Sequence, residues 1–216
     1  MNKWVEAQKW EKDWWSDCRN TVWEDVKQMN LAPYLGLKIV PNEHTNYRIP
    51  LNGEKVLDIG GGPSSLLLKC ENVQGTVVDP CEYPEWVEER YKACGIEYLP
   101  IKGEDMGYEN EFDEVWIYNV LQHVKKPKKI IENALRAGKI IRIFEWINTG
   151  VSKGHPHSFT KEQLEEWLGG KGKVIKLSGG GLYGQAFHGV FLGKDYDSKA
   201  EFLLDKSKSG YSLNKN

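Results

Sequence analysis

Two acidic residues flank a run of three glycines in a pattern that suits a cofactor-binding turn. Gly60–Gly62 follows the short apolar stretch Lys55–Ile59, Asp58 lies within that stretch, and Asp79 ends the next apolar stretch twenty-one residues later. Glycines let a chain turn sharply and lie against a ligand. A carboxylate at the end of a strand can accept hydrogen bonds from both ribose hydroxyls. The spacing therefore predicts a site for a nucleoside.

Two classes of cofactor compete for this turn. A dinucleotide is bound by G-x-G-x-x-G, which places the pyrophosphate on the N-terminus of the following helix, but Ser65 occupies the last position of that pattern here. The carboxylate of Asp58, two residues before the first glycine, suits the α-ammonium group of S-adenosylmethionine better than a phosphate. Charge therefore favours the aminoacyl cofactor and leaves NAD as the alternative.

Two further segments are expected to contact the cofactor. Glu104 and Asp105 offer acceptors for an adenine amino group, with Met106 as an apolar cover, although this segment also fits a solvated turn. Asn119 ends another apolar stretch and is expected to shape the pocket, or to serve only as a turn residue.

The elements that position these residues alternate between strand and helix. This order predicts a mostly parallel sheet covered on both faces, with an antiparallel hairpin at one edge. Ligands bind at the carboxyl ends of the strands in such sheets. The predicted strands are 55–59, 76–79, 96–101, 112–118, 139–144, 173–177 and 186–192, and the predicted helices are 64–70, 84–94, 127–137 and 160–168.

The N-terminal segment is unusually rich in tryptophan. Apolar residues recur mostly every fourth position over 3–29, which predicts one bent helix or two short ones with a break near 18–21, where Asn20 or Thr21 could cap the second helix. Residues 38–53 read as a polar connector. Tryptophans at helical spacing are more often packing residues than ligand contacts. The alternative is an acceptor cavity lined by Trp10, Trp14, Trp15 and Tyr34.

Length and composition narrow the function classes. The 216 residues suffice for one core, and 29 basic against 31 acidic residues give a nearly neutral chain, which disfavours a nucleic-acid partner. No stretch is long and apolar enough for a membrane span and the N-terminus lacks a signal-peptide core, so a cytoplasmic location is expected. The domain expectation is a helical cap and connector over 1–50, a core over 51–195 and a polar tail over 196–216.

Metal binding is not expected from the cysteines or histidines. Cys18, Cys70, Cys81 and Cys94 show no C-x-x-C spacing. His155 and His157 could share a metal, but no acidic or sulfur ligand is adjacent to them. They are interpreted as part of a substrate-contacting loop.

The successive motifs resemble those of class I S-adenosylmethionine-dependent methyltransferases over roughly 55–193. They are Val56–Gly62, Val77–Pro80, Gly103–Asp105 and Tyr118–Val124, and the Gly62-Pro63 step is stiffer than usual. The resemblance implies a Rossmann-like seven-stranded sheet with a reversed last strand, a small-molecule acceptor, and cofactor contacts at Asp58, Gly60, Gly62, Asp79, Asp105 and Asn119. The other expected cofactor contacts are Gly61, Pro80, Glu104, Met106 and Val120.

Methyl transfer requires little beyond holding an acceptor in line with the methyl group and excluding water. His123, just past the fourth strand of the core, is the candidate base for an acceptor that must lose a proton, and its alternative is loop packing. Glu145 and Trp146 follow the fifth strand, where substrate would approach. The resemblance also implies that helices before the first strand lie over the cofactor.

The leading hypothesis is methyl transfer to a hydroxyl or amino group of a small acceptor, such as a sugar or another metabolite, by a monomer or a homodimer. A nucleotide-binding oxidoreductase and a non-catalytic scaffold are the alternatives. Methylation of nucleic acid is disfavoured, because the D/N-P-P-Y/F segment of adenine-amino enzymes is replaced by Asn119–Gln122.

Overall fold

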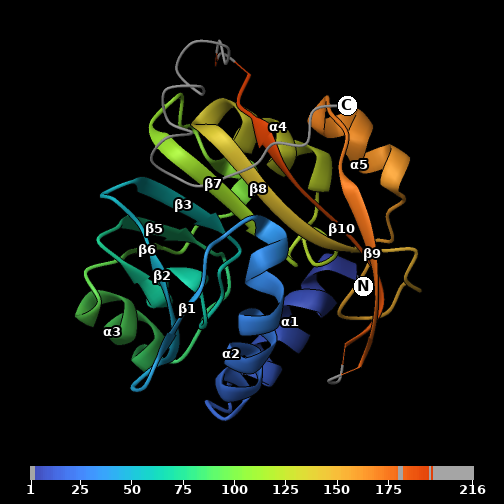
Figure 1. Cartoon of the computed structure of the whole chain (residues 1–216). Coiled ribbons are helices and arrows are strands. Elements are labelled where there is room, and N and C mark those ends of the chain that lie inside the picture. Colours follow the sequence, from blue (N-terminus) through green and yellow to red (C-terminus); the bar gives the residue numbers. More distant parts are fainter. Residues whose placement is uncertain (1–2, 180–181, 195, 197–216) are drawn as a thin grey trace.

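The computed structural model describes residues 3–179, 182–194 and 196 (Figure 1). Its helices are α1 Lys3–Trp15, α2 Asn20–Leu31, α3 Glu85–Ala93, α4 Pro127–Ala137 and α5 Lys161–Leu168, with short 3-10 helices η1 Ala32–Leu35, η2 Leu66–Lys69 and η3 Gly103–Asp105. Its strands are β1 Val40–Asn42, β2 Asn46–Pro50, β3 Lys55–Ile59, β4 Cys70–Glu71, β5 Gln74–Val78, β6 Glu97–Leu99, β7 Phe112–Tyr118, β8 Gly138–Ile147, β9 Lys173–Gly179 and β10 Leu182–Leu192.

Seven of these strands form one sheet in the order β6-β5-β3-β7-β8-β10-β9. The first five are parallel to one another, and β10 runs antiparallel to both β8 and β9. The chain therefore has the Rossmann-like fold with a reversed last strand that the sequence predicts. Because β3 and β5 end side by side, the turn at Gly60–Gly62 and the end of β5 at Asp79 meet at the same edge of the sheet.

The sheet separates two apolar clusters, one on each face. Successive side chains of a strand point to opposite faces, and β7 shows this directly: Val115 and Ile117 pack with α4 and α5 in one cluster, whereas Trp116 packs in the other with η1 and α3. With both faces covered, four of the five residues of β3 are buried. The short, continuously apolar strands of the sequence follow from this burial.

Two predictions of secondary structure between 38 and 70 are wrong. The predicted connector 38–53 contains the antiparallel pair β1–β2, and β2 also pairs in parallel with β4 in a separate three-stranded sheet. The predicted helix 64–70 is only the single turn η2, followed by β4. Strand pairing between 49–50 and 70–71 is a tertiary contact, so local sequence patterns do not predict it.

The N-terminal segment forms two helices, with the break at 16–19 where it is expected, but the predicted cap is wrong. Arg19 holds the N-cap position of α2 and makes no side-chain cap hydrogen bond. The Asn20 amide instead donates to the carbonyl of Trp14 at the end of α1, and the Thr21 hydroxyl donates to the carbonyl of Cys18. Both side chains therefore fix the turn between the helices.

The carboxyl ends of β3, β7 and β8 point toward α1 and α2 in Figure 1. The two helices thus cover the edge of the sheet where ligands bind in open parallel sheets. No helix in the described ranges has the length and apolar character that a bilayer span requires. The apolar cluster 202–204, where the sequence predicts a marginal helix, and the rest of the tail lie outside the described residues.

A buried ion pair joins the sheet to the N-terminal helices. The guanidinium of Arg142, on β8, donates to both carboxylate oxygens of Glu114, on β7, at 2.6 and 2.7 Å. It also donates to the carbonyl of Leu35 at the end of η1. Glu114 accepts a further hydrogen bond from the indole of Trp116. Both charges are almost fully buried, so each depends on the other for compensation.

Replacing Arg142 with Ala should lower the free energy of unfolding by about 3–5 kcal/mol, because Glu114 would remain buried without its counter-charge. Chemical denaturation followed by circular dichroism measures this. Lys139→Ala is the matched control: it breaks the half-exposed pair with Asp113 between the same strands and should cost less than about 1 kcal/mol. Equal losses in the two variants would contradict a special role for the buried pair.

Candidate active site

One cavity of about 330 Å³ lies between the carboxyl ends of the parallel strands and the helices α1 and α2. Pockets that bind drug-sized ligands are typically roughly 300–1,000 Å³, so its size suits a small-molecule cofactor. The expected cofactor residues that line it are Asp58, Gly60, Gly61, Gly62, Asp79, Pro80, Glu104, Asn119 and Val120. Of the other expected site residues, Trp10, Trp14, His123 and His155 also line it.

The glycine turn is close-packed at its first two positions. Gly60 has φ +73°, and a Cβ atom there would lie 2.0 Å from a methyl group of Val120. A Cβ on Gly61 would lie 2.7 Å from the Asp58 carboxylate. Gly62 also has a positive φ, +56°, with only Tyr83 within 4 Å of a hypothetical Cβ. The turn therefore needs glycine for steric reasons at its start and for backbone conformation at its end.

Asp58 forms part of the floor of the cavity and is almost fully buried. Its carboxylate accepts a hydrogen bond from the Ser65 hydroxyl at 2.5 Å. Burial raises the pKa of Asp58 to about 7, against the lowering effect of that hydrogen bond, and the nearby Asp79 adds to the rise. Burial removes the water that stabilises the charge of this carboxylate, and a cation placed against it would stabilise that charge instead.

Asp79 lies at the end of β5 and is held by three donors. Its carboxylate accepts hydrogen bonds from the backbone N–H groups of Gly62 and Cys81, at 3.1 and 2.9 Å, and from the Tyr83 hydroxyl. Burial nevertheless raises the pKa of Asp79 to about 6. The two aspartates therefore place two buried carboxylates on either side of the glycine turn.

Asn119 and Glu104 complete the expected cofactor contacts that reach the cavity. Asn119 has a left-handed backbone, φ +52°, and its side-chain oxygen is buried without a hydrogen-bond partner among the described residues. Such an orphaned acceptor fits a ligand with donor groups. Glu104 lines the cavity while accepting hydrogen bonds from the backbone N–H groups of Lys125 and Lys126.

The structure does not bring Asp105 and Met106 to the cavity. Asp105 is exposed at the end of η3, and Met106 is buried in the apolar cluster packed around α4. The one-turn helix η3 directs these neighbours to opposite environments, and this depends on packing that the sequence motif does not specify.

Tyr34 and Trp146 pack around Phe144 rather than line the cavity. His157 contacts the carbonyl oxygen of Val124 through Nε2 at 2.8 Å, away from His155. Across the part of the chain that the structure covers, no group of three or more His, Cys, Asp or Glu side chains is arranged to hold a metal ion.

Glu145 lies behind the cavity wall, fully buried. Its carboxylate accepts hydrogen bonds from the backbone N–H groups of Val120 and Leu121 and from the side chain of Gln122. Burial raises the pKa of Glu145 to about 7 despite these donors. Glu145 therefore fixes the loop that carries Val120 and His123 rather than lining the cavity with them.

Helix α1 forms the roof of the cavity through contacts with three loops of the sheet edge. Gln8 contacts the Cys81 thiol after β5, Glu11 contacts His123 after β7, and Trp10 packs against Gly154 after β8. The side of α1 that carries Gln8 and Lys12 thus faces the loop after β5, and the side that carries Trp10 and Glu11 faces the loops after β7 and β8. The sequence does not reveal Glu11 as a site residue because its partner is 112 positions away.

Glu11, His123 and His155 form a titratable cluster in the roof. His123 Nδ1 lies 2.8 Å from the Glu11 carboxylate, and the rings of His123 and His155 are 4.6 Å apart. Burial lowers the pKa of His123, but Glu11 outweighs this and holds that pKa above its ordinary value. Burial and the charge of His123 lower the pKa of His155. The environment therefore favours the protonated form of His123, beside Glu11, and the neutral form of His155.

Comparison with known proteins agrees with this geometry. Residues 57–140 match the family model described as "Methyltransferase domain". The chain thus carries a methyltransferase domain over these residues. The matched segment runs from β3 into β8 and so includes both aspartates, the glycine turn and His123. None of the curated proteins compared with the chain matches it in sequence.

Solved structures share the fold of this chain at low sequence identity. A chain of the complex between the Haloferax volcanii Trm112 methyltransferase activator and a methyltransferase superposes with a TM-score of 0.60 at 12% identity, covering 85% of this chain and 97% of the other. Burkholderia thailandensis 1,6-didemethyltoxoflavin-N1-methyltransferase gives 0.51 at 18% identity (78% and 76% covered), and magnesium protoporphyrin IX methyltransferase from Synechocystis gives 0.50 at 15% (79% and 80%).

Affinity for S-adenosylhomocysteine should increase as the pH rises from 5.5 to 8. Asp58 and Asp79 are protonated at low pH, since their pKa values are about 7 and about 6, whereas a ligand with an α-ammonium group requires at least one of them ionised. We expect roughly a tenfold or greater gain in affinity, accompanied by proton release. Calorimetry in buffers of different ionisation enthalpy measures both. Equal affinity at both ends of this range would contradict the placement of the carboxylates.

Stability of the protein without cofactor should follow the opposite trend. A carboxyl group whose pKa is higher in the folded than in the unfolded state binds its proton more tightly when folded, so its ionisation lowers stability. Asp58, Asp79 and Glu145 all have raised pKa values. We expect the free energy of unfolding to fall as the pH rises from about 4 to about 7, and Asp58→Asn to reduce that slope. Denaturant titrations at several pH values measure it.

Proposed function

We propose that the protein transfers the methyl group of S-adenosylmethionine to a hydroxyl or amino group of a small acceptor. The observation that carries this proposal is that a single cavity joins the glycine turn and its two buried aspartates to the Glu11–His123–His155 cluster. The cofactor supplies an electrophilic methyl group on a sulfonium. Everything else required is positioning, exclusion of water and a place for a proton.

The cofactor half of the cavity fits this donor. In the proposal, Asp58 interacts with the α-ammonium group beside the glycine turn, Asp79 accepts hydrogen bonds from the ribose hydroxyls, and Asn119 accepts a donor from the same molecule. The orphaned oxygen of Asn119 and the raised pKa values of the two carboxyls support these roles. A dinucleotide would instead bring a pyrophosphate toward two buried carboxylates, an unfavourable pairing of like charges.

The histidine cluster provides an imidazole that can take the proton lost by the methyl acceptor. The acceptor oxygen or nitrogen attacks the methyl carbon, the carbon–sulfur bond breaks with its electrons passing to sulfur, and the acceptor proton passes to an imidazole. His155 is the better receiver, because its lowered pKa keeps it neutral. Glu11 raises the pKa of His123 and so favours its protonated form, and in this proposal His123 positions His155 and the Glu11 roof. His123, the residue that the sequence favours as base, thus becomes a positioning residue.

Replacing Gly60 with Ala should weaken S-adenosylhomocysteine binding by more than about tenfold. The new methyl group would overlap Val120 and displace the turn. Gly95→Ala is the matched control, since Gly95 has a similar positive φ, +68°, and no atom within 4 Å of a Cβ. It should cost about 1 kcal/mol of stability, as left-handed backbone strain does, with binding unchanged.

Calorimetric titration of the wild-type protein tests the cofactor class itself. We expect binding of S-adenosylhomocysteine and none of NAD. Binding of NAD alone would overturn the proposed function and favour an oxidoreductase. Binding of neither would favour a non-catalytic scaffold.

A further inference from the structure

Five of the nine tryptophans of the chain line the same cavity, all from residues 4–23. Trp4 lies near the Asp79 end, where Lys102 sits over its ring. The other four also line the cavity and are here named the tryptophan wall: Trp10, Trp14, Trp15 and Trp23.

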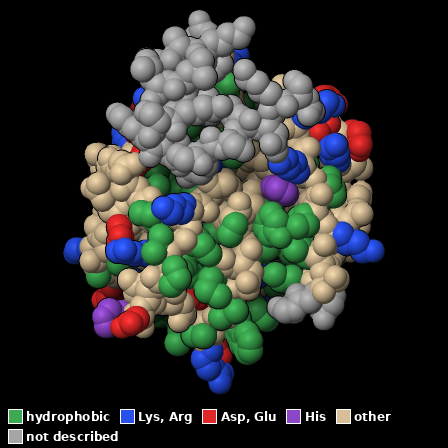
Figure 2. All heavy atoms as spheres, in the orientation of Figure 1, with side chains coloured by type: hydrophobic (Ala, Val, Ile, Leu, Met, Phe, Trp, Pro, Cys, Tyr) green, Lys and Arg blue, Asp and Glu red, His purple; other side chains and the backbone are tan. Residues whose placement is uncertain are grey.

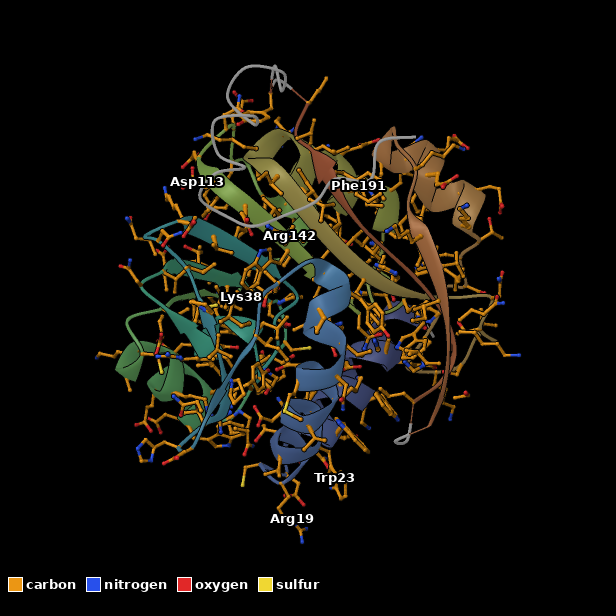
Figure 3. The ribbon with its side chains drawn as sticks, in the orientation of Figure 1. Arg19, Trp23, Lys38, Asp113, Arg142 and Phe191 are labelled. Atoms are coloured by element: carbon orange, nitrogen blue, oxygen red, sulfur yellow. The ribbon has the colours of Figure 1, made fainter. Side chains whose placement is uncertain are left out.

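The tryptophan wall is incompletely covered by protein. Trp10 and Trp14 stack in parallel, with ring centroids 5.7 Å apart and an interplanar angle of 8°, yet they are 40% and 46% exposed. Trp23 is 74% exposed and extends from the end of α2 farthest from the sheet, next to Arg19 (Figure 3). Figure 2 shows hydrophobic side chains gathered on the face that carries α2. These rings leave flat apolar surface for a ligand to cover.

The polar side chains beside the wall are already engaged with one another. The Glu11 carboxylate interacts with His123 and accepts a hydrogen bond from the Trp15 indole, and Glu24 forms an ion pair with Lys27. The amides of Asn20 and Gln28 donate to backbone carbonyls. A polyol buried here would leave most of its hydroxyl groups without partners, at a cost for each. The carboxylates are also paired, so the wall offers little to a charged ligand.

Few polar groups beside the wall remain available. The buried hydroxyl of Tyr118, a residue that lines the cavity, is engaged in a side-chain hydrogen bond with Glu24. His155 lines the same cavity, with its ring 6.1 Å from that of Trp10. The wall therefore provides broad flat apolar surface and a small number of polar contacts near the histidines.

We propose that the methyl acceptor is an uncharged planar aromatic or heteroaromatic molecule whose ring lies against Trp10 and Trp14 and whose reacting hydroxyl or N–H group faces His155. This inference rests on the proposed function and names its substrate class. It disfavours the carbohydrate acceptor that the sequence leaves open, because a sugar would need more polar partners than the wall supplies.

The test uses the full chain saturated with S-adenosylhomocysteine and compares three probes by calorimetry: hydroxynaphthalene, its fully saturated decalinol counterpart, and glucose. We expect hydroxynaphthalene to bind at least about tenfold more tightly than decalinol, since only the planar ring can stack on the indoles. We expect no measurable binding of glucose. Decalinol or glucose binding as tightly as hydroxynaphthalene would overturn the proposal.

Variants locate the binding surface. Trp14→Ala should weaken hydroxynaphthalene binding about tenfold while leaving S-adenosylhomocysteine affinity unchanged, and Trp14→Phe should restore most of the loss. Trp86→Ala, which removes an indole from α3 outside the cavity, should change neither. Unchanged hydroxynaphthalene binding in folded Trp14→Ala would contradict the stacking role. A wild-type protein that fails to bind S-adenosylhomocysteine would instead contradict the proposed function, so the two failures are distinguishable.

Discussion

The rest of this structure depends on two carboxylates that are buried beside one tight turn. Asp58 and Asp79 approach each other because β3 and β5 are adjacent parallel strands that end at the same level, and the turn at Gly60–Gly62 fits between them without side chains. Removing two negative charges from water is costly unless something compensates them. Hydrogen bonds from Ser65, Gly62 and Cys81 compensate in part. A cationic amino-acid nucleoside would compensate the rest of this negative charge.

The same argument explains why the roof differs in character from the floor. The floor is a rigid sheet edge whose backbone positions the carboxylates, and Glu145 stabilises the adjoining loop from behind. The roof is a pair of helices that contacts the loops through single residues such as Gln8, Glu11 and Trp10. Its Glu11 and Glu24 carboxylates are paired, with His123 and Lys27, and its exposed surface is aromatic. In the proposed function, cofactor binding and acceptor selection thus fall to parts of the chain with different chemistry.

The histidine pair shows how environment divides one residue type into two roles. His123 and His155 are 4.6 Å apart, but only His123 contacts a carboxylate. Its positive charge then disfavours a second proton on His155. The sequence places His123 in the recognisable motif and so favours it as the base. The contact of His123 with Glu11, on a helix that precedes the whole sheet, favours His155 as the base in the proposed reaction.

The sequence by itself determines the order of the strands and helices, the cofactor turn and the class of cofactor, because these depend on residues close together in the chain. The apolar stretches at 55–59 and 112–118, the glycines and Asp79 are sufficient for that. Tertiary structure alone decides that β2 pairs with β4, that Asp105 and Met106 stay out of the cavity, and that Glu11 meets His123. Because these contacts join segments that are distant in sequence, or depend on the direction of a short helix, local periodicity does not predict them.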